Sequence, residues 1–110
     1  LAWLEADLKA AAADRAAGRR LWIVAGGHRP FGELEASHGA LFEKYGVDAY
    51  FAGHSHSYAR SRYAFASGNF SMLHIVAGGA GCDEMAQAPA VAAGARGTPA
   101  VSSYKTSRYS

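Results

Sequence analysis

The sequence has little of what marks several classes of protein. It contains one cysteine, Cys82, so no disulfide forms within its 110 residues and the redox compartment stays open. No apolar run approaches the roughly 20 residues that cross a bilayer, so we expect no membrane partner. The net charge is only +2 and the basic residues are scattered, which gives no footprint for nucleic acid. These absences favour a small globular domain or a part of one.

Both ends of the sequence fall inside patterns that are not finished. Leu1 opens within a helical pattern, and Ser103–Ser110 alternates like the beginning of a strand. We therefore expect residues 1–110 to form one partial domain of a larger protein, without an internal repeat or boundary. Residues Met85–Ser102 are rich in alanine, glycine and proline and lack periodicity, which predicts a loop or linker.

Hydrophobic periodicity predicts alternating helices and strands, and hence the α/β class. Helical spacing predicts a helix from Leu1 to about Ala17 that ends at Gly18, and a second over Glu33–Tyr45 that ends at Gly46. Apolar runs and alternation predict four strands: Leu21–Ala25, Val47–Ala52, Arg60–Phe65 and Phe70–Ala77. The first strand is apolar at every position, which is typical of a strand covered on both faces.

Three histidines follow the first two predicted strands. A strand, a helix and a strand in quick succession predict a parallel βαβ unit, whose strands end at the same edge of the sheet. His28 follows the first strand, and His54 and His56 follow the second after a turn at Gly53. On an extended backbone, positions i and i+2 point to the same side. We therefore expect three imidazoles to converge on one site for zinc, iron or a similar transition metal, although a pair of unliganded loop histidines is the alternative.

Three segments together carry a resemblance to a known family. They are Ala25-Gly-Gly-His28-Arg-Pro30, the run from Tyr45 through Gly53-His-Ser-His56 to Arg60, and His74-Ile-Val-Ala-Gly-Gly-Ala-Gly-Cys82. In order and spacing they resemble the C-terminal half of a purple acid phosphatase, within the calcineurin-like metallophosphoesterases. The resemblance implies that this chain is the C-terminal part of a four-layer α/β/β/α sandwich.

The resemblance also implies a dinuclear centre of Fe(III) with Zn(II), Fe(II) or Mn(II). His28 and His54 resemble ligands of the divalent metal, and His56 resembles the ligand of the ferric ion. The family's other ligands are two aspartates, a tyrosine and an asparagine from upstream motifs that do not occur here. The implied activity of the intact protein is hydrolysis of phosphate monoesters by attack of a metal-bound hydroxide, and we expect residues 1–110 alone to be inactive.

Several further residues are weighed individually. His38 lies on the apolar side of its predicted helix, so packing is favoured, although some relatives place a substrate-contacting histidine between the ligand motifs and it stays a catalytic candidate. We expect His74 to be buried and hydrogen-bonded. Arg29 and Arg60 are candidates for binding the substrate's phosphate, with ion pairing as the alternative. Asn69-Phe-Ser71 fits the N-glycosylation pattern and agrees with the secreted, vacuolar or lysosomal setting that the family implies.

Two other functions stay open at this point. The histidine motif does not distinguish monoester from diester substrates, so a phosphodiesterase or nucleotidase of the same superfamily is possible. A non-catalytic domain that keeps the fold to bind metal or phosphate is the other alternative. In each enzymatic case the partner is a small phosphate ester, and the sequence does not reveal the oligomeric state.

Overall fold

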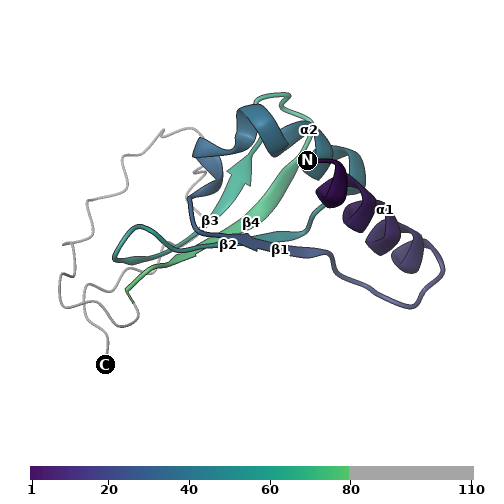
Figure 1. The fold of residues 1–110 in the computed structure, drawn as a ribbon. Coiled ribbons are helices and arrows are strands. Elements are labelled where there is room, and N and C mark those ends of the chain that lie inside the picture. Colours follow the sequence, from purple (N-terminus) through teal and green to yellow (C-terminus); the bar gives the residue numbers. More distant parts are fainter. Residues whose placement is uncertain (80–110) are drawn as a thin grey trace.

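The computed structural model describes residues 1–79, which form two helices, one 3-10 turn and four strands (Figure 1). In chain order these elements are α1 (Ala2–Ala16), β1 (Val24–Gly27), η1 (Phe31–Glu33), α2 (Glu35–Tyr45), β2 (Ala49–Ala52), β3 (Tyr58–Ala64) and β4 (Ser71–Ala77). The predicted loop at Met85–Ser102, the strand begun at Ser103 and the residue Cys82 lie outside this range. Within it, no helix combines the length and the apolar character needed to cross a membrane.

The strands form one sheet in the order β1-β2-β4-β3. β1 pairs with β2 and β2 with β4 in parallel, whereas β3 runs antiparallel to β4. The predicted βαβ unit is therefore confirmed, with η1 and α2 as its crossover. Both helices lie on the same face of the sheet (Figure 1). This arrangement confirms the α/β class and is consistent with part of a metallophosphoesterase sandwich.

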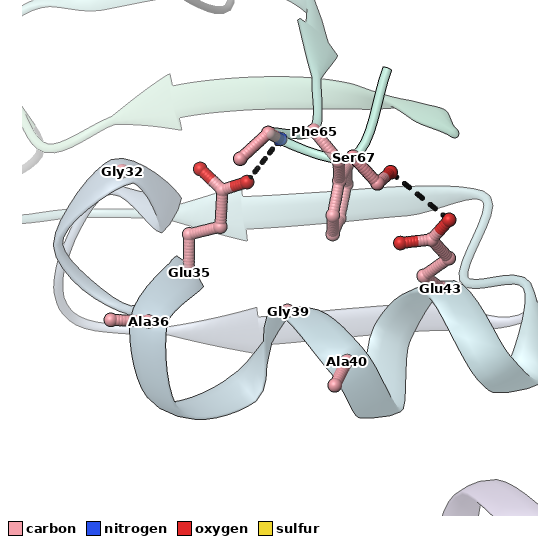
Figure 2. A pocket seen from close by; sticks show the side chains of 9 residues that line it. Gly32, Glu35, Ala36, Gly39, Ala40, Glu43, Phe65 and Ser67 are labelled. Atoms are coloured by element: carbon pink, nitrogen blue, oxygen red, sulfur yellow. Dashed lines mark hydrogen bonds between the residues drawn. The ribbon is translucent and has the colours of Figure 1, made fainter. Parts of the chain in front are cut away.

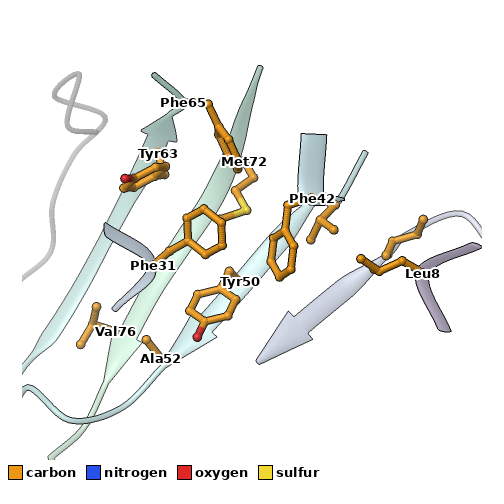
Figure 3. Close-up of a cluster of buried hydrophobic side chains, with 11 residues drawn as sticks. Leu8, Phe31, Phe42, Tyr50, Ala52, Tyr63, Phe65, Met72 and Val76 are labelled. Carbon is orange, nitrogen blue, oxygen red and sulfur yellow. The ribbon is translucent and has the colours of Figure 1, made fainter. Parts of the chain in front are cut away.

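Phe31 lies at the centre of the core between the sheet and α2 (Figure 3). Its side chain is completely buried and its ring stacks on Phe42 at 4.8 Å between centroids. The rings of Tyr50, Tyr63 and Phe65 surround it at 5.2–5.3 Å. Aromatic pairs at such separations add to the gain from burial itself. The 3-10 turn that follows His28 is thereby fixed to the sheet.

The expected strand Leu21–Ala25 was wrong in its bounds. β1 begins at Val24, because at Ile23 the neighbouring segment offers the Asp48 carboxylate instead of a backbone carbonyl, and this carboxylate accepts the Ile23 N–H at 2.8 Å. β1 then continues through Gly26 and Gly27, which were expected in the loop. Its outer face is open among residues 1–79, where Trp22 is 72% exposed.

The uncovered face of the sheet is apolar over β1, β2 and β4, whereas β3 carries Arg60 and Arg62 there. Val24 on β1, Phe51 on β2 and Leu73 on β4 are exposed there, while the alternate positions face the helices. Single exposed apolar residues are ordinary, but a face shared by three neighbouring strands is larger than that. The resemblance implies a four-layer sandwich, and such a sandwich requires a second layer packed on this face.

Arg15 joins the end of α1 to the end of α2. Its guanidinium donates to the carbonyl oxygens of Tyr45 at 2.7 Å and Gly46 at 2.9 Å, and it pairs with Asp48 at 3.2 Å. Gly46 ends α2 in the left-handed conformation, as predicted, with φ at 65°. The last carbonyls of a helix lack intrahelical partners, so a cation there satisfies them and the helix dipole together.

Replacing Arg15 by methionine should destabilise the chain by about 1–3 kcal/mol, because hydrogen bonds to charged groups contribute about this much. The matched control is Arg19→Met, which removes an exposed ion pair with Asp14 that we expect to contribute less than about 1 kcal/mol. Urea unfolding of both variants checks the difference. Equal losses in the two variants would contradict the bridging role of Arg15.

Candidate functional site

The carboxyl ends of β1, β2 and β4 meet at one edge of the sheet, because the three strands are parallel. His28 comes directly after β1, and His54 comes two residues after the end of β2. The Gly53 N–H donates to the carbonyl oxygen of His28 at 3.0 Å, which joins the two loops. The loop between β2 and β3 and the end of β4 lie together at the left of Figure 1.

The structure brings His28 and His54 into contact. The Nε2 atom of His28 lies 3.3 Å from Nδ1 of His54, and the ring centroids are 5.2 Å apart at an interplanar angle of 73°. Both side chains are exposed. The expectation that histidines from two separate strand ends converge is therefore met for this pair.

Arg29 contacts the His54 ring. Its Nη1 lies 3.0 Å from Nε2 of His54. A guanidinium can only donate hydrogen bonds, so this contact favours the tautomer in which Nε2 of His54 is the acceptor. In that tautomer the Nδ1–H of His54 faces Nε2 of His28. Arg29 also pairs with Glu33 at 3.4 Å.

The backbone of the second histidine loop is not extended, contrary to the sequence-based argument about positions i and i+2. His54 has a φ of 61°, in the left-handed region that residues with a Cβ rarely adopt. The bend is fixed by short-range bonds, with the Ser55 N–H donating to the Gly53 carbonyl and the Ser57 N–H to the Ser55 carbonyl, both at 2.7 Å. The orientation of His54 is thus set by a turn and not by the pleat of a strand.

Gly78 lets the end of β4 support this turn. A Cβ at position 78 would collide with the carbonyl oxygen of Ser55, and the Gly78 N–H donates to the Ser57 carbonyl at 3.2 Å. The glycine that follows β4 is therefore required by the close approach of two backbones.

His56 lies in the same turn and is half-buried. Within residues 1–79, no group of three or more His, Cys, Asp or Glu side chains is arranged to hold a metal ion. The structure thus supplies two converging imidazoles. The roles of His28, His54 and His56 as metal ligands stay predictions.

The other candidate residues lie on other elements of the fold. Arg60 is exposed on β3, opposite Ile75. His38 is half-buried on α2, and its Nδ1 lies 2.6 Å from the Ser37 hydroxyl oxygen. Asn69 is exposed in the turn between β3 and β4. Their proposed roles in catalysis, substrate binding and glycosylation also stay predictions.

A groove of about 440 Å³ runs between α2 and the turn after β3 (Figure 2). Small residues of α2 and the ring of Phe65 line it, and the carboxylates of Glu35 and Glu43 bind the Ala66 N–H and the Ser67 hydroxyl at its two sides. None of the five histidines lines it. Both carboxylates have partners, so the groove shows no chemistry of its own.

Two residues below the histidine loop were not predicted from the sequence to have a functional role. Tyr50 on β2 donates its hydroxyl to the Arg29 carbonyl at 2.9 Å, and His74 on β4 accepts the Phe31 N–H at its Nε2. His74 is 8% exposed, which confirms that it is buried and hydrogen-bonded. Burial lowers the pKa of His74 and raises the pKa of Tyr50. The sequence did hold a signal for both roles, because Tyr50 and His74 are polar residues at core-facing positions of otherwise apolar strands.

These features are consistent with part of an α/β metallophosphoesterase fold that carries histidines at one edge of its sheet. No model of a known protein family matches the chain. Its sequence is similar to acid phosphatase type 7 of mouse, with 34% identity over 116 aligned positions that cover 76% of this chain and 26% of the mouse protein. It is also similar to acid phosphatase type 7 of human, with 35% identity over 74% of this chain and 26% of the human protein.

These relatives confirm the resemblance to the purple acid phosphatases that the histidine motifs indicate. The chain spans about a quarter of the length of the curated relatives it matches. The similarity therefore covers only a part of those proteins.

Replacing His54 by glycine should give a more stable chain than replacing it by alanine, by about 0.5–1 kcal/mol. Relief of left-handed strain gains about 1–2 kcal/mol, which exceeds the extra chain entropy of about 0.5–1 kcal/mol that glycine loses on folding. Position 56 is the control, because the only residue with a side chain and a positive φ in the range 1–79 is His54. At position 56 the alanine variant should be more stable than the glycine variant. If urea unfolding ranks alanine and glycine in the same order at positions 54 and 56, the strained turn is contradicted.

Proposed function

We propose that this chain is the C-terminal, histidine-bearing part of a metal-dependent acid phosphatase that hydrolyses phosphate monoesters at a dinuclear centre. Its similarity to two acid phosphatases supports the reaction class. The observation that carries the proposal is the contact between the ring nitrogens of His28 and His54 at the carboxyl edge of a parallel sheet. Open α/β sheets bind their ligands at this edge.

The separation of the two nitrogens fits ligands of one metal ion. Zinc–imidazole bonds of about 2.0–2.1 Å in a tetrahedral site place two ligand nitrogens about 3.3–3.4 Å apart. The distance between Nε2 of His28 and Nδ1 of His54 is 3.3 Å. His28 and His54 would hold the divalent metal, and His56 the ferric ion.

Arg29 lies beside the two histidines that would hold the metal, with its Nη1 3.0 Å from Nε2 of His54. Its side chain is 52% exposed, and a guanidinium there would suit a phosphate group by charge and geometry. This supports Arg29 as a phosphate-binding residue, with Arg60 as a second candidate.

The dinuclear centre needs ligands beyond this chain. Two metal ions about 3.5–4 Å apart stabilise the attacking and leaving oxygens of a phosphoryl transfer and supply an activated water. Neutral imidazoles alone give no anionic bridge between such ions. The missing carboxylate, phenol and amide ligands belong to the remaining three quarters of a protein of the relatives' length. Residues 1–110 alone are accordingly inactive in this proposal.

The compartment and the partners follow from the same resemblance. A secreted, vacuolar or lysosomal setting agrees with a glycan on Asn69, which is exposed in a turn. The partner is a small phosphate ester, with Fe(III) and Zn(II), Fe(II) or Mn(II) as the metal pair. A phosphodiesterase of the superfamily or a non-catalytic binding domain is the alternative. Relative rates on aryl phosphate monoesters and diesters, with metal content, distinguish the three.

Replacing His28 or His54 by alanine in the full-length protein should lower its hydrolysis of an aryl phosphate monoester by at least about 100-fold, because each change removes a ligand. Metal content by elemental analysis should fall in the same variants. Arg19→Met, remote from the histidine edge, is the control with unchanged rate and metal.

The chain of residues 1–110 alone is the negative control, and it should release no phosphate above background. Full activity and full metal content in the His28→Ala and His54→Ala variants would refute the proposal. A His38→Gln variant with lower turnover and unchanged metal would assign the catalytic role to His38.

A further inference from the structure

Three polar side chains of the sheet hold the segment that follows His28. Tyr50 on β2 donates to the Arg29 carbonyl at 2.9 Å, and His74 on β4 accepts the Phe31 N–H at 3.3 Å. Tyr63 on β3 donates to the Glu35 carboxylate at 2.6 Å. The segment from residue 29 to residue 35 is thus tied to three neighbouring strands, through two backbone groups and one side chain.

All three side chains are buried, and His74 is the one whose polarity is hardest to explain by packing. It occupies a core-facing position on β4 and lies 8% exposed among apolar neighbours. Its ring packs on Tyr50, with centroids 6.0 Å apart, and edge-on to Tyr63 at 5.8 Å. A leucine would fill the same space without the cost of burying a polar ring. The acceptor nitrogen therefore has a use, and that use is the Phe31 N–H.

The Phe31 N–H needs this acceptor because of its place in the fold. Phe31 opens the 3-10 turn η1, where the first N–H groups have no partner within the turn. The Phe31 side chain is completely buried, so its N–H has little access to water. Leaving such a group unpaired costs about 1–3 kcal/mol. Three residues earlier the chain carries His28, and only Arg29 and Pro30 intervene.

Tyr50 fixes the other side of the same short segment. A Cβ at Gly27 would collide with the Tyr50 hydroxyl, so the glycine before His28 makes room for that hydroxyl to reach the Arg29 carbonyl. His28 therefore lies between Gly27 on the strand and two backbone groups that are fixed by hydrogen bonds, the Arg29 carbonyl and the Phe31 N–H.

We propose that His74 is a positioning residue, which accepts the Phe31 N–H and thereby orients the His28 loop toward His54. As a contribution to metal binding this rests on the proposed function. Burial lowers the pKa of His74, so its ring stays an acceptor to lower pH than that of an exposed histidine. The groups facing the ring are the Tyr50 and Tyr63 phenols and the Phe31 N–H, with the Glu35 carboxylate beyond Tyr63.

The test compares three variants of the residues 1–110 chain. His74→Leu fills the space without an acceptor, whereas His74→Gln returns a carbonyl oxygen within reach of the same N–H. Met72→Leu changes a buried side chain two residues away on the same face of β4 and serves as the packing control. Amide hydrogen exchange is measured at Phe31 and, as a reference for overall opening, at Val47, which bonds the Phe42 carbonyl.

In the His74→Leu variant, exchange at Phe31 relative to Val47 should rise at least tenfold, and the nuclear Overhauser contact between the rings of His28 and His54 should weaken. His74→Gln and Met72→Leu should stay within about threefold of the original chain. Nitrogen shifts of the original His74 ring should show an unprotonated Nε2. Unchanged relative exchange in His74→Leu, or no rescue by His74→Gln, would overturn the inference.

A titration of the full-length protein with Zn²⁺ alone separates this inference from the proposed function. Loss of an outer residue that orients a ligand lowers metal affinity by about 10–100-fold, so His74→Leu should bind Zn²⁺ at least tenfold more weakly than Met72→Leu. Zn²⁺ binding that needs His28 but is unaffected in His74→Leu would sink the positioning role and leave the metal site standing. No Zn²⁺ binding by the original full-length protein, with the exchange pattern intact, would sink the metal site and support the positioning role.

Discussion

Parallel pairing of β1 with β2 is the constraint on which the rest of this structure depends. It sends two strands to the same edge of the sheet, so residues 26 positions apart in sequence, His28 and His54, come within one hydrogen bond of each other. An antiparallel pair would have carried the two histidines to opposite edges. The crossover that permits parallel pairing is η1 with α2, and its anchor is the buried ring of Phe31. The core and the candidate site therefore share one element.

The histidine edge combines a strained turn with tightly held surroundings. His54 adopts a backbone conformation that costs energy for any residue with a Cβ, and such strain persists only where neighbouring groups determine it. Gly53 bonds to His28, and Gly78 packs against Ser55. Below the His28 loop, the core supplies the Tyr50 hydroxyl and the His74 ring. These contacts together restrict the orientation of both histidine loops.

Much of the fold could be predicted from the sequence, because its signals are local. Apolar spacing and glycine caps gave both helices and all four strands of residues 1–79, and strand–helix–strand order gave the parallel pair. The start of β1 was missed because the Asp48 side chain replaces a backbone acceptor opposite Ile23, which no periodicity records. The contact of His28 with His54 followed from topology. The turn at His54 and the anchoring of Phe31 by His74 depend on contacts between residues far apart in sequence, and no local pattern encodes them.

The central claim is that His28 and His54 face each other in order to hold one metal ion. The most direct measurement is a crystal structure of the full-length protein loaded with zinc, with the metal located by its anomalous scattering. The account predicts one zinc ion bonded to Nε2 of His28 and to Nδ1 of His54, each at about 2.0–2.1 Å. A zinc ion bound elsewhere, or only one of these two histidines bonded to it, would contradict the account.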